Sequence, residues 1–82
     1  MRGELVAVDL ETTGFDPAGD KIIEIGAVRM IDGVIVDEFA TLINPERPIP
    51  ANITTLTGIR NEDVYNAPGI ATVLPSLKAF VG

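Results

Sequence analysis

The alternation of apolar and polar positions in the first half of the chain predicts three β-strands. Residues 5–10 are apolar on both alternating faces, a pattern typical of a strand buried on both sides within an α/β sheet. Residues 21–31 and 34–43 follow, and Asp32-Gly33 between them is a strong signal for a two-residue hairpin turn. Side chains expected to share one face of their strand are Ile23, Ile25 and Ala27 in the second strand, and Ile35, Phe39 and Ile43 in the third. We therefore predict a three-stranded antiparallel meander.

The second half of the chain predicts helices. Residues 51–56 can form a short helix, and a turn can run from residue 61 to residue 65. From Gly69 to Val81, apolar residues recur at helical spacing. Pro75 lies inside that stretch, where it would remove one helical hydrogen bond, or it stands in the first turn of a helix that begins near Leu74, where it would be harmless. The predicted fold class is α/β, with helices after the meander.

Size and composition place the chain among small globular domains. Its 82 residues, 46% of them hydrophobic, allow one domain, residues 1–82. The absence of cysteine excludes disulfides and thiolate metal sites. No apolar run is long enough for a membrane span and no signal-peptide pattern is present, so we expect a cytoplasmic location and no membrane partner. The net charge of −6 argues against a phosphate-binding surface, unless the acids hold divalent ions that supply positive charge.

Two carboxylates, Asp9 and Glu11, stand two residues apart where the first apolar strand ends. Alternation puts both on one face, about 6.5–7 Å apart at the backbone, and carboxylates at that spacing can share a hard divalent ion such as Mg²⁺. Carboxylates on an otherwise apolar strand are costly unless they are paired, protonated or bound to metal. The alternative is an ordinary exposed acidic strand end. Other acids, among them Asp16, Asp20 and Asp37, have the setting of turn or solvent-facing residues.

Four separated segments resemble, in order and spacing, the DEDD 3′–5′ exonuclease family. They are VDLETTGF (residues 8–15), KIIEIGAV (21–28), INP with a following IP (43–45 and 49–50), and LTGI (56–59). This family includes the proofreading subunit of bacterial DNA polymerase III, the proofreading insert of PolC-type polymerases and the exonuclease domain joined to DinG-type helicases. The similarity is to the histidine-type branch, and it implies a ribonuclease H-like fold.

The resemblance also implies an activity and a site. Family members remove nucleotides from nucleic-acid 3′ ends with two divalent metal ions, Mg²⁺ or Mn²⁺, about 4 Å apart. By analogy, the catalytic and metal-binding residues are Asp9, which would contact both metals, and Glu11, which would contact one. The implied substrate-binding residues are Leu10, Thr12, Thr13, Leu56 and Thr57. For Leu56 an ordinary core position is an equal alternative, and for Thr57 a helix-ending turn is the stronger one.

The implied partners are the single-stranded 3′ end of DNA or RNA and a DNA polymerase or helicase, in the same chain or another. A DEDD site, however, needs four carboxylates and a histidine or tyrosine base. The third and fourth acids and the base belong to later family motifs, and this chain contains no histidine. We therefore expect a partial exonuclease domain with the first motif only, without useful hydrolysis on its own.

The missing later motifs also affect the sheet. In the family, the first strand has a fourth strand on its other side. Without it, residues 5–10 would form an exposed apolar edge that pairs with another copy or a partner segment. Two other functions stay open: a non-catalytic folding or interaction module of the same lineage, and an unrelated small acidic α/β domain in which Asp9 and Glu11 are incidental.

Overall fold

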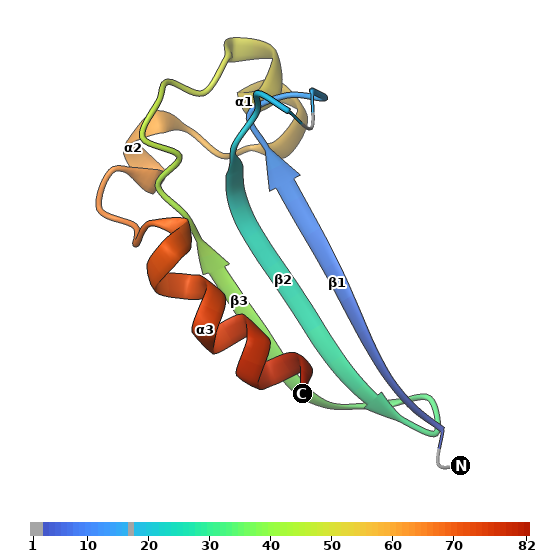
Figure 1. Ribbon diagram of the computed structural model, residues 1–82. Coiled ribbons are helices and arrows are strands. Elements are labelled where there is room, and N and C mark those ends of the chain that lie inside the picture. The colour runs from blue at the N-terminus through green and yellow to red at the C-terminus, as the bar shows by residue number, and fades with distance from the viewer. Residues whose placement is uncertain (1–2, 17) are drawn as a thin grey trace.

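The chain folds into a three-stranded sheet followed by helices (Figure 1). The computed structural model describes residues 3–16 and 18–82. The strands are β1 (Glu4–Thr12), β2 (Ile22–Ile31) and β3 (Val34–Leu42), and the helices are α1 (Ala51–Thr57), α2 (Asn61–Val64) and α3 (Ile70–Val81). The predicted α/β arrangement of an antiparallel meander with helices after it is confirmed.

The turn between β2 and β3 has the backbone that its sequence predicts. Asp32 and Gly33 both adopt positive φ angles, 51° and 82°. A type I′ turn requires positive φ at both central residues, and its twist matches the right-handed twist of the flanking strands. Asp and Gly tolerate this conformation better than branched residues do. The hairpin is therefore fixed by local chemistry.

Strand β1 lies at an edge of the sheet, whose order is β1-β2-β3. Its apolar side chains are correspondingly open, with Leu5 57% exposed and Val8 and Leu10 each almost half exposed. The expectation of a strand buried on both sides is thus wrong for the described residues, because β2 is the only strand that pairs with β1 among them. The expected exposed apolar edge is confirmed.

One extra residue in β3 interrupts the expected alternation. The register shifts between Arg29 and Met30, so Ile35 lies opposite Met30 whereas Phe39 lies opposite Ala27. Directly opposed residues share a face, and Met30 and Ala27, three residues apart, face opposite ways. The prediction that Ile35 and Phe39 share a face is therefore wrong, because a bulge reverses the face of the residues before it.

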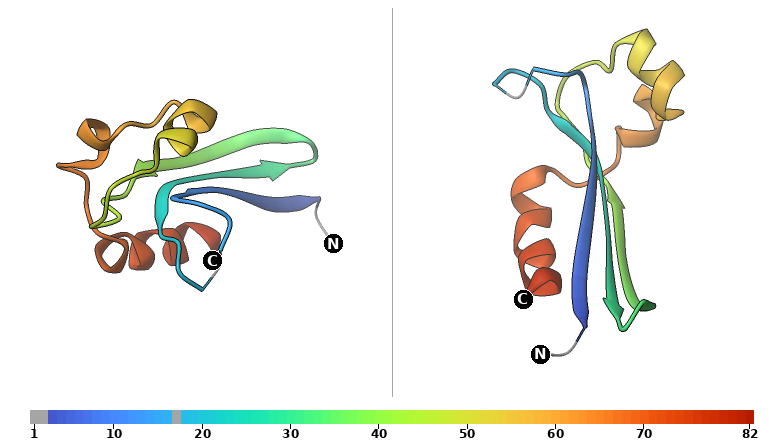
Figure 2. Two further views of the ribbon diagram at one scale, coloured as in Figure 1. Left: turned by 90° about the horizontal axis from the view of Figure 1, so that it is seen from above. Right: turned by 90° about the vertical axis from the view of Figure 1, so that its right-hand side faces the viewer.

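Two groups of buried side chains hold the helices against the sheet. One joins β2 to α1, α2 and the segments around them: Ile23, Ile49, Ile53, Ile59 and Val64. The other joins β2 and the end of β3 to α3: Ile25, Ile43 and Val73, with Phe39, Ile70 and Leu77 packed around them. Figure 2 shows α3 running along one face of the sheet, while α1 and α2 gather near the end where β1 finishes. Among the described residues, no helix is both long and apolar enough to cross a bilayer.

Arg29 links the last turn of α3 to the sheet. Its guanidinium donates to the Phe80 carbonyl and lies 5.3 Å from the centre of the Phe80 ring. The same group bonds the Glu4 carboxylate at 2.9 Å. The Phe80 ring in turn packs on Phe39, with ring centroids 5.8 Å apart. A single side chain thus connects β1, β2 and the carbonyl end of α3, where a positive charge is favourable.

Helix α3 starts at Ile70, so Pro75 stands in its interior and the alternative start near Leu74 is wrong. The proline ring removes the hydrogen bond to the carbonyl of Ala71. Pro75 and Ala71 are both exposed, so water can reach this carbonyl. Packing of Val73 in the core outweighs the lost hydrogen bond, and tertiary contacts rather than local propensity decide where the helix begins.

Candidate active site

The carboxylates of Asp9 and Glu11 share the face of the sheet that is turned away from α3. Asp9 lies opposite Gly26, and Glu11 lies opposite Glu24. The residue between them, Leu10, lies opposite the fully buried Ile25, which faces the helices. Because side chains alternate along a strand, Asp9 and Glu11 point to the other, open face. The shared face expected for these two residues is confirmed.

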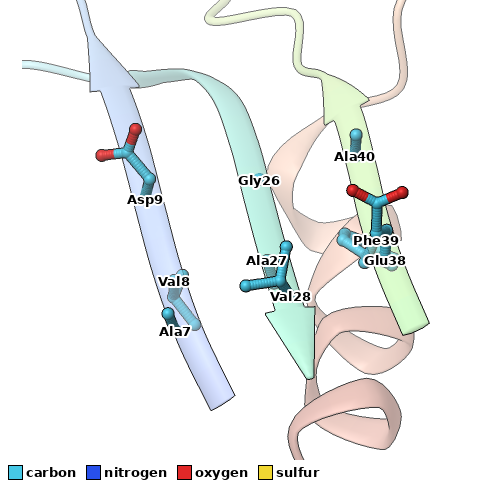
Figure 3. A pocket seen from close by; sticks show the side chains of 9 residues that line it. All are labelled: Ala7, Val8, Asp9, Gly26, Ala27, Val28, Glu38, Phe39 and Ala40. Atoms are coloured by element: carbon cyan, nitrogen blue, oxygen red, sulfur yellow. The ribbon is translucent and has the colours of Figure 1, made fainter. Parts of the chain in front are cut away.

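A shallow hollow opens beside Asp9 (Figure 3). It has a volume of about 450 Å³, and its floor runs across all three strands, from Asp9 over Gly26 to Glu38. Gly26 has no side chain, and a Cβ placed there would meet no other atom within 4 Å. Small alanines, Ala7 and Ala40, also line the floor. The backbone therefore leaves open space next to the Asp9 carboxylate.

Glu38 is an acid of this face that sequence reasoning did not single out. It lies opposite Val28, so it shares the open face with Asp9. Its place depends on the register of β3 and on the bulge near Ile35, neither of which the strand pattern reveals. The result is a face with carboxylates at both sides of Gly26, which favours cations over anions.

The donor set suits part of a hard-metal site. Asp9 and Glu11 offer carboxylate oxygens, the ligands that Mg²⁺ prefers, and Mg²⁺ keeps several waters in such sites. Within residues 3–16 and 18–82, however, no group of three or more His, Cys, Asp or Glu side chains is arranged to hold a metal ion. The two carboxylates and the space at Gly26 fit a divalent ion that takes its other ligands from water or from further protein groups.

In the loop after β1, the backbone N–H and the hydroxyl of Thr13 both form hydrogen bonds within the protein. Its N–H donates to the Lys21 carbonyl at 2.8 Å, and its hydroxyl donates to the Asp20 carboxylate at 2.8 Å. The same hydroxyl accepts the Lys21 N–H at 3.0 Å. Thr13 is 2% exposed. Both donors of Thr13 are thus engaged inside the protein, and the geometry gives this residue a structural task in place of a direct hydrogen bond to a ligand.

Asp20 is a second residue whose role the sequence did not indicate. The Asp16 N–H that bonds its carboxylate, together with the Thr13 hydroxyl, lowers the pKa of Asp20 below its ordinary value of 3.8. The expectation of a plain turn or solvent-facing acid is therefore incomplete. The only sequence feature that could have indicated this role is an aspartate seven residues after a threonine, and many loops contain such a pair.

The side chains of Leu10 and Thr12 lie differently from the carboxylates. Leu10 faces the helix side of the sheet and is almost half exposed, so its side chain and Asp9 lie on opposite faces. Thr12 ends β1, and its hydroxyl donates to the Gly14 carbonyl.

Leu56 and Thr57 close helix α1 in contrasting ways. Leu56 is 67% exposed, so the core interpretation of this residue is wrong and the side chain is available for contact. The Thr57 hydroxyl donates to the Ile53 carbonyl at 2.9 Å and accepts the Ile59 N–H at 3.1 Å. Gly58 then ends the helix with a φ of 80°. Thr57 thus serves the helix-ending turn. Figure 1 shows α1 near the end of the sheet where β1 finishes.

Comparison with known proteins gives one consistent result. The sequence profile of the family described as Exonuclease (RNase_T) matches residues 6–82. "DNA polymerase III PolC-type" of Clostridium perfringens (strain 13 / Type A) is 52% identical over 79 residues, which are 96% of this chain and 6% of that protein. "DNA polymerase III subunit epsilon" of Aquifex aeolicus (strain VF5) is 44% identical over 82 residues, which are 100% of this chain and 41% of that protein. The chain therefore spans less than half the length of these relatives.

Solved structures agree on the fold. Exonuclease X, in complex with 5′ overhanging duplex DNA, superimposes with a TM-score of 0.78 at 33% identity, over 88% of this chain and 42% of that one. The nuclease domain of 3′hExo, a DEDDh family member bound to rAMP, superimposes with a TM-score of 0.83 at 24% identity, over 96% of this chain and 44% of that one. The sheet and helices of the described residues thus match the corresponding part of ribonuclease H-like exonuclease domains.

Proposed function

The chain belongs to the Exonuclease family, and from this we propose that it supplies the first two carboxylates of a metal-dependent active site that removes nucleotides from nucleic-acid 3′ ends. One observation carries the proposal: Asp9 and Glu11 share the open face of the sheet, and Gly26 leaves space beside them. The rest of the active site would come from protein groups beyond these two, since a DEDD site contains four carboxylates and a base.

In this site Asp9 would hold both of two Mg²⁺ or Mn²⁺ ions, and Glu11 one of them. When bound, such ions activate the attacking water and stabilise the charge on the leaving oxygen. The protein's own contribution is placement. Strand β1 fixes both carboxylates on one rigid face, and rigid elements position ligands better than loops do.

The substrate we propose is the single-stranded 3′ end of DNA. DNA rather than RNA is favoured because the relatives that match nearly the whole chain include several DNA polymerase III proteins. The terminal 3′-hydroxyl would lie at the backbone around Thr12, and the exposed Leu56 would pack against the last base. A DNA polymerase, in the same chain or another, would be the partner that presents this end during proofreading. The same exonuclease chemistry would also serve repair.

A labelled-oligonucleotide assay tests the proposal. The substrate carries its label at the 3′ nucleotide, and the assay compares this chain with a version extended in its own reading frame by about a hundred residues, enough to complete a typical domain. We expect Mg²⁺-dependent release of the 3′ nucleotide by the extended version and none by the 82-residue chain. Asp9→Asn in the extended version should lower the rate by about 1,000-fold, because metal ions supply several kcal/mol of transition-state stabilisation.

The matched control is Glu62→Gln, which removes one negative charge from the exposed surface of α2. This variant should keep the rate within about twofold, as expected of a surface position away from the site. If the extended version releases nothing, or if Asp9→Asn and Glu62→Gln behave alike, the proposed function is wrong. An inactive extended version that still binds a partner would instead favour the non-catalytic module.

A further inference from the structure

A carboxylate outside the metal site braces the segment that follows Glu11. Asp20 stands at the far end of the loop after β1, and each of its oxygens accepts a different hydrogen bond. Oδ1 accepts the Thr13 hydroxyl at 2.8 Å, and Oδ2 accepts the Asp16 N–H at 2.9 Å. The residue therefore connects the beginning and the middle of the loop.

The backbone at Gly14 packs closely against the Asp20 carboxylate. A Cβ built on Gly14 would lie 2.5 Å from Asp20 Oδ2 and 2.8 Å from Cγ, closer than a Cβ atom approaches atoms to which it is not bonded. Only glycine fits at this position while Asp20 keeps its place. The Asp20 N–H also donates to the Asp16 carbonyl at 2.8 Å. The turn is thus packed on the carboxylate as well as hydrogen-bonded to it.

The two hydrogen bonds require a carboxylate rather than an amide. An ionised Asp offers two acceptor oxygens, whereas Asn offers one acceptor and one donor group. Asn at position 20 can accept from Thr13 or from Asp16, and the other donor is left without its acceptor. Thr13→Val keeps the shape of a buried side chain and removes its hydroxyl, so it loses the bond to Asp20 and also the bond from the Lys21 N–H.

We propose that Asp20 is a positioning residue, which holds the backbone from Thr12 to Gly14 in the shape that receives the 3′-terminal nucleotide, a role that rests on the proposed function. Asp20 touches neither the metal ligands nor the space at Gly26, and it acts through Thr13. Strand β1 fixes Asp9 and Glu11 independently of the loop. Loss of the brace should therefore weaken nucleotide binding and leave metal binding intact.

The test measures two affinities on the 82-residue chain. Mn²⁺ binding is followed by water-proton relaxation, and binding of deoxyadenosine monophosphate in saturating Mg²⁺, which is diamagnetic, is followed by NMR shifts of backbone amides. Asp20→Asn should weaken nucleotide binding by about tenfold, the effect of one hydrogen bond to a charged or buried group, and Thr13→Val should weaken it at least as much because it removes two hydrogen bonds. Mn²⁺ affinity should change by less than about twofold, because the carboxylates stay on β1.

Two variants serve as controls. Thr13→Ser keeps the hydroxyl and should bind the nucleotide like the parent chain, and Glu62→Gln removes a negative charge elsewhere. If Asp20→Asn and Thr13→Val lower thermal stability but bind the nucleotide as tightly as the parent chain, the role is structural only and the inference is overturned. If the parent chain binds Mn²⁺ through Asp9 but no nucleotide, the inference is overturned and the proposed function stands. If it shows no Mn²⁺ binding that depends on Asp9, the proposed function is contradicted, and the inference with it.

Discussion

Asp9 on β1 lies directly opposite Gly26 on β2, on the open face of the sheet. The two strands thus place a carboxylate beside the one position of β2 that has no side chain. A Cβ at Gly26 would meet no atom within 4 Å, so neither packing nor a positive φ requires glycine there. The absence of a side chain at Gly26 leaves room next to the Asp9 carboxylate.

Gly26→Val should therefore raise thermal stability and weaken metal binding. Glycine in a strand interior costs roughly 0.5–1 kcal/mol relative to alanine, and a β-branched residue suits a strand, so the variant should unfold at a higher temperature. Its methyl groups would fill the space beside Asp9, and Mn²⁺ affinity should fall by about tenfold, as in other disturbed metal surroundings. Ala40→Val adds methyl groups to the floor of the same hollow, on the side of Gly26 away from Asp9, and should leave Mn²⁺ binding unchanged. Equal Mn²⁺ affinity in both variants would mean that the space at Gly26 is not used.

The acids of the open face should contribute unequally to metal binding. Asp9→Asn and Glu11→Gln should each weaken Mn²⁺ binding by about tenfold or more, because each removes half of the two-carboxylate set. Glu38→Gln should change it by less than about twofold, because Glu38 lies two strands away across Gly26. Electron paramagnetic resonance of free Mn²⁺ measures all three. A larger loss of Mn²⁺ affinity in Glu38→Gln than in Asp9→Asn would show that the ion binds near Glu38, and it would contradict the proposed site.

Acid should loosen the loop after β1 before it unfolds the sheet. The pKa of Asp20 is lowered, first by the Asp16 N–H and then by the Thr13 hydroxyl. A lowered pKa means that the bonds to Asp20 stabilise the loop fully above the ordinary value of 3.8, and that this stabilisation is lost as the pH falls through the lower, folded-state pKa. Hydrogen exchange of the Asp16 amide should accelerate, after correction for its intrinsic rate, as the pH falls below 3.8. In Asp20→Ala, which leaves the Asp16 N–H without this acceptor, the corrected rate should be fast at every pH, and an unchanged profile would contradict the assignment.

Arg29 should matter more to stability than its surface position suggests. Arg29→Met removes the bond to the Phe80 carbonyl, the ring contact and the ion pair with Glu4. The expected loss is about 1–3 kcal/mol in the free energy of unfolding, with faster hydrogen exchange in the last turn of α3. Arg60→Met is the control, because Arg60 is 63% exposed in a loose ion pair, and it should cost less than about 0.5 kcal/mol. Urea unfolding compares the two, and equal losses would show that Arg29 does not hold α3 in place.

The open edge of β1 should promote self-association at high concentration. Its unpaired backbone groups and exposed apolar side chains are a template for another strand. Val8→Lys places a charge on that edge and should shift sedimentation towards the monomer. Leu56→Lys makes a comparable change on α1 and should have no such effect. A monomeric parent chain with protected amides on both sides of β1 would rule out pairing along this edge.

The parts of the structure that depend on local chemistry could be predicted from the sequence. Asp32-Gly33 specifies its own turn, and the spacing of Asp9 and Glu11 places them on one face whatever the rest of the sheet does. The bulge near Ile35 could not be predicted, because it is a property of two paired strands. The same holds for the bonds of Asp20, since a carboxylate in a loop has many potential partners and the fold selects among them.

The fully engaged donors of Thr13 have a thermodynamic consequence. A loop that is held by its own hydrogen bonds has already lost its conformational entropy when the protein folds. In the proposed site, a nucleotide at Glu11 and Thr12 would meet a surface that needs no further ordering, and the free energy of contact would go to affinity rather than to organising the loop. Binding should therefore be fast, because no slow ordering of the loop has to accompany it. Loosening of the loop would appear first as a larger unfavourable entropy of binding, before any change in the contacts themselves.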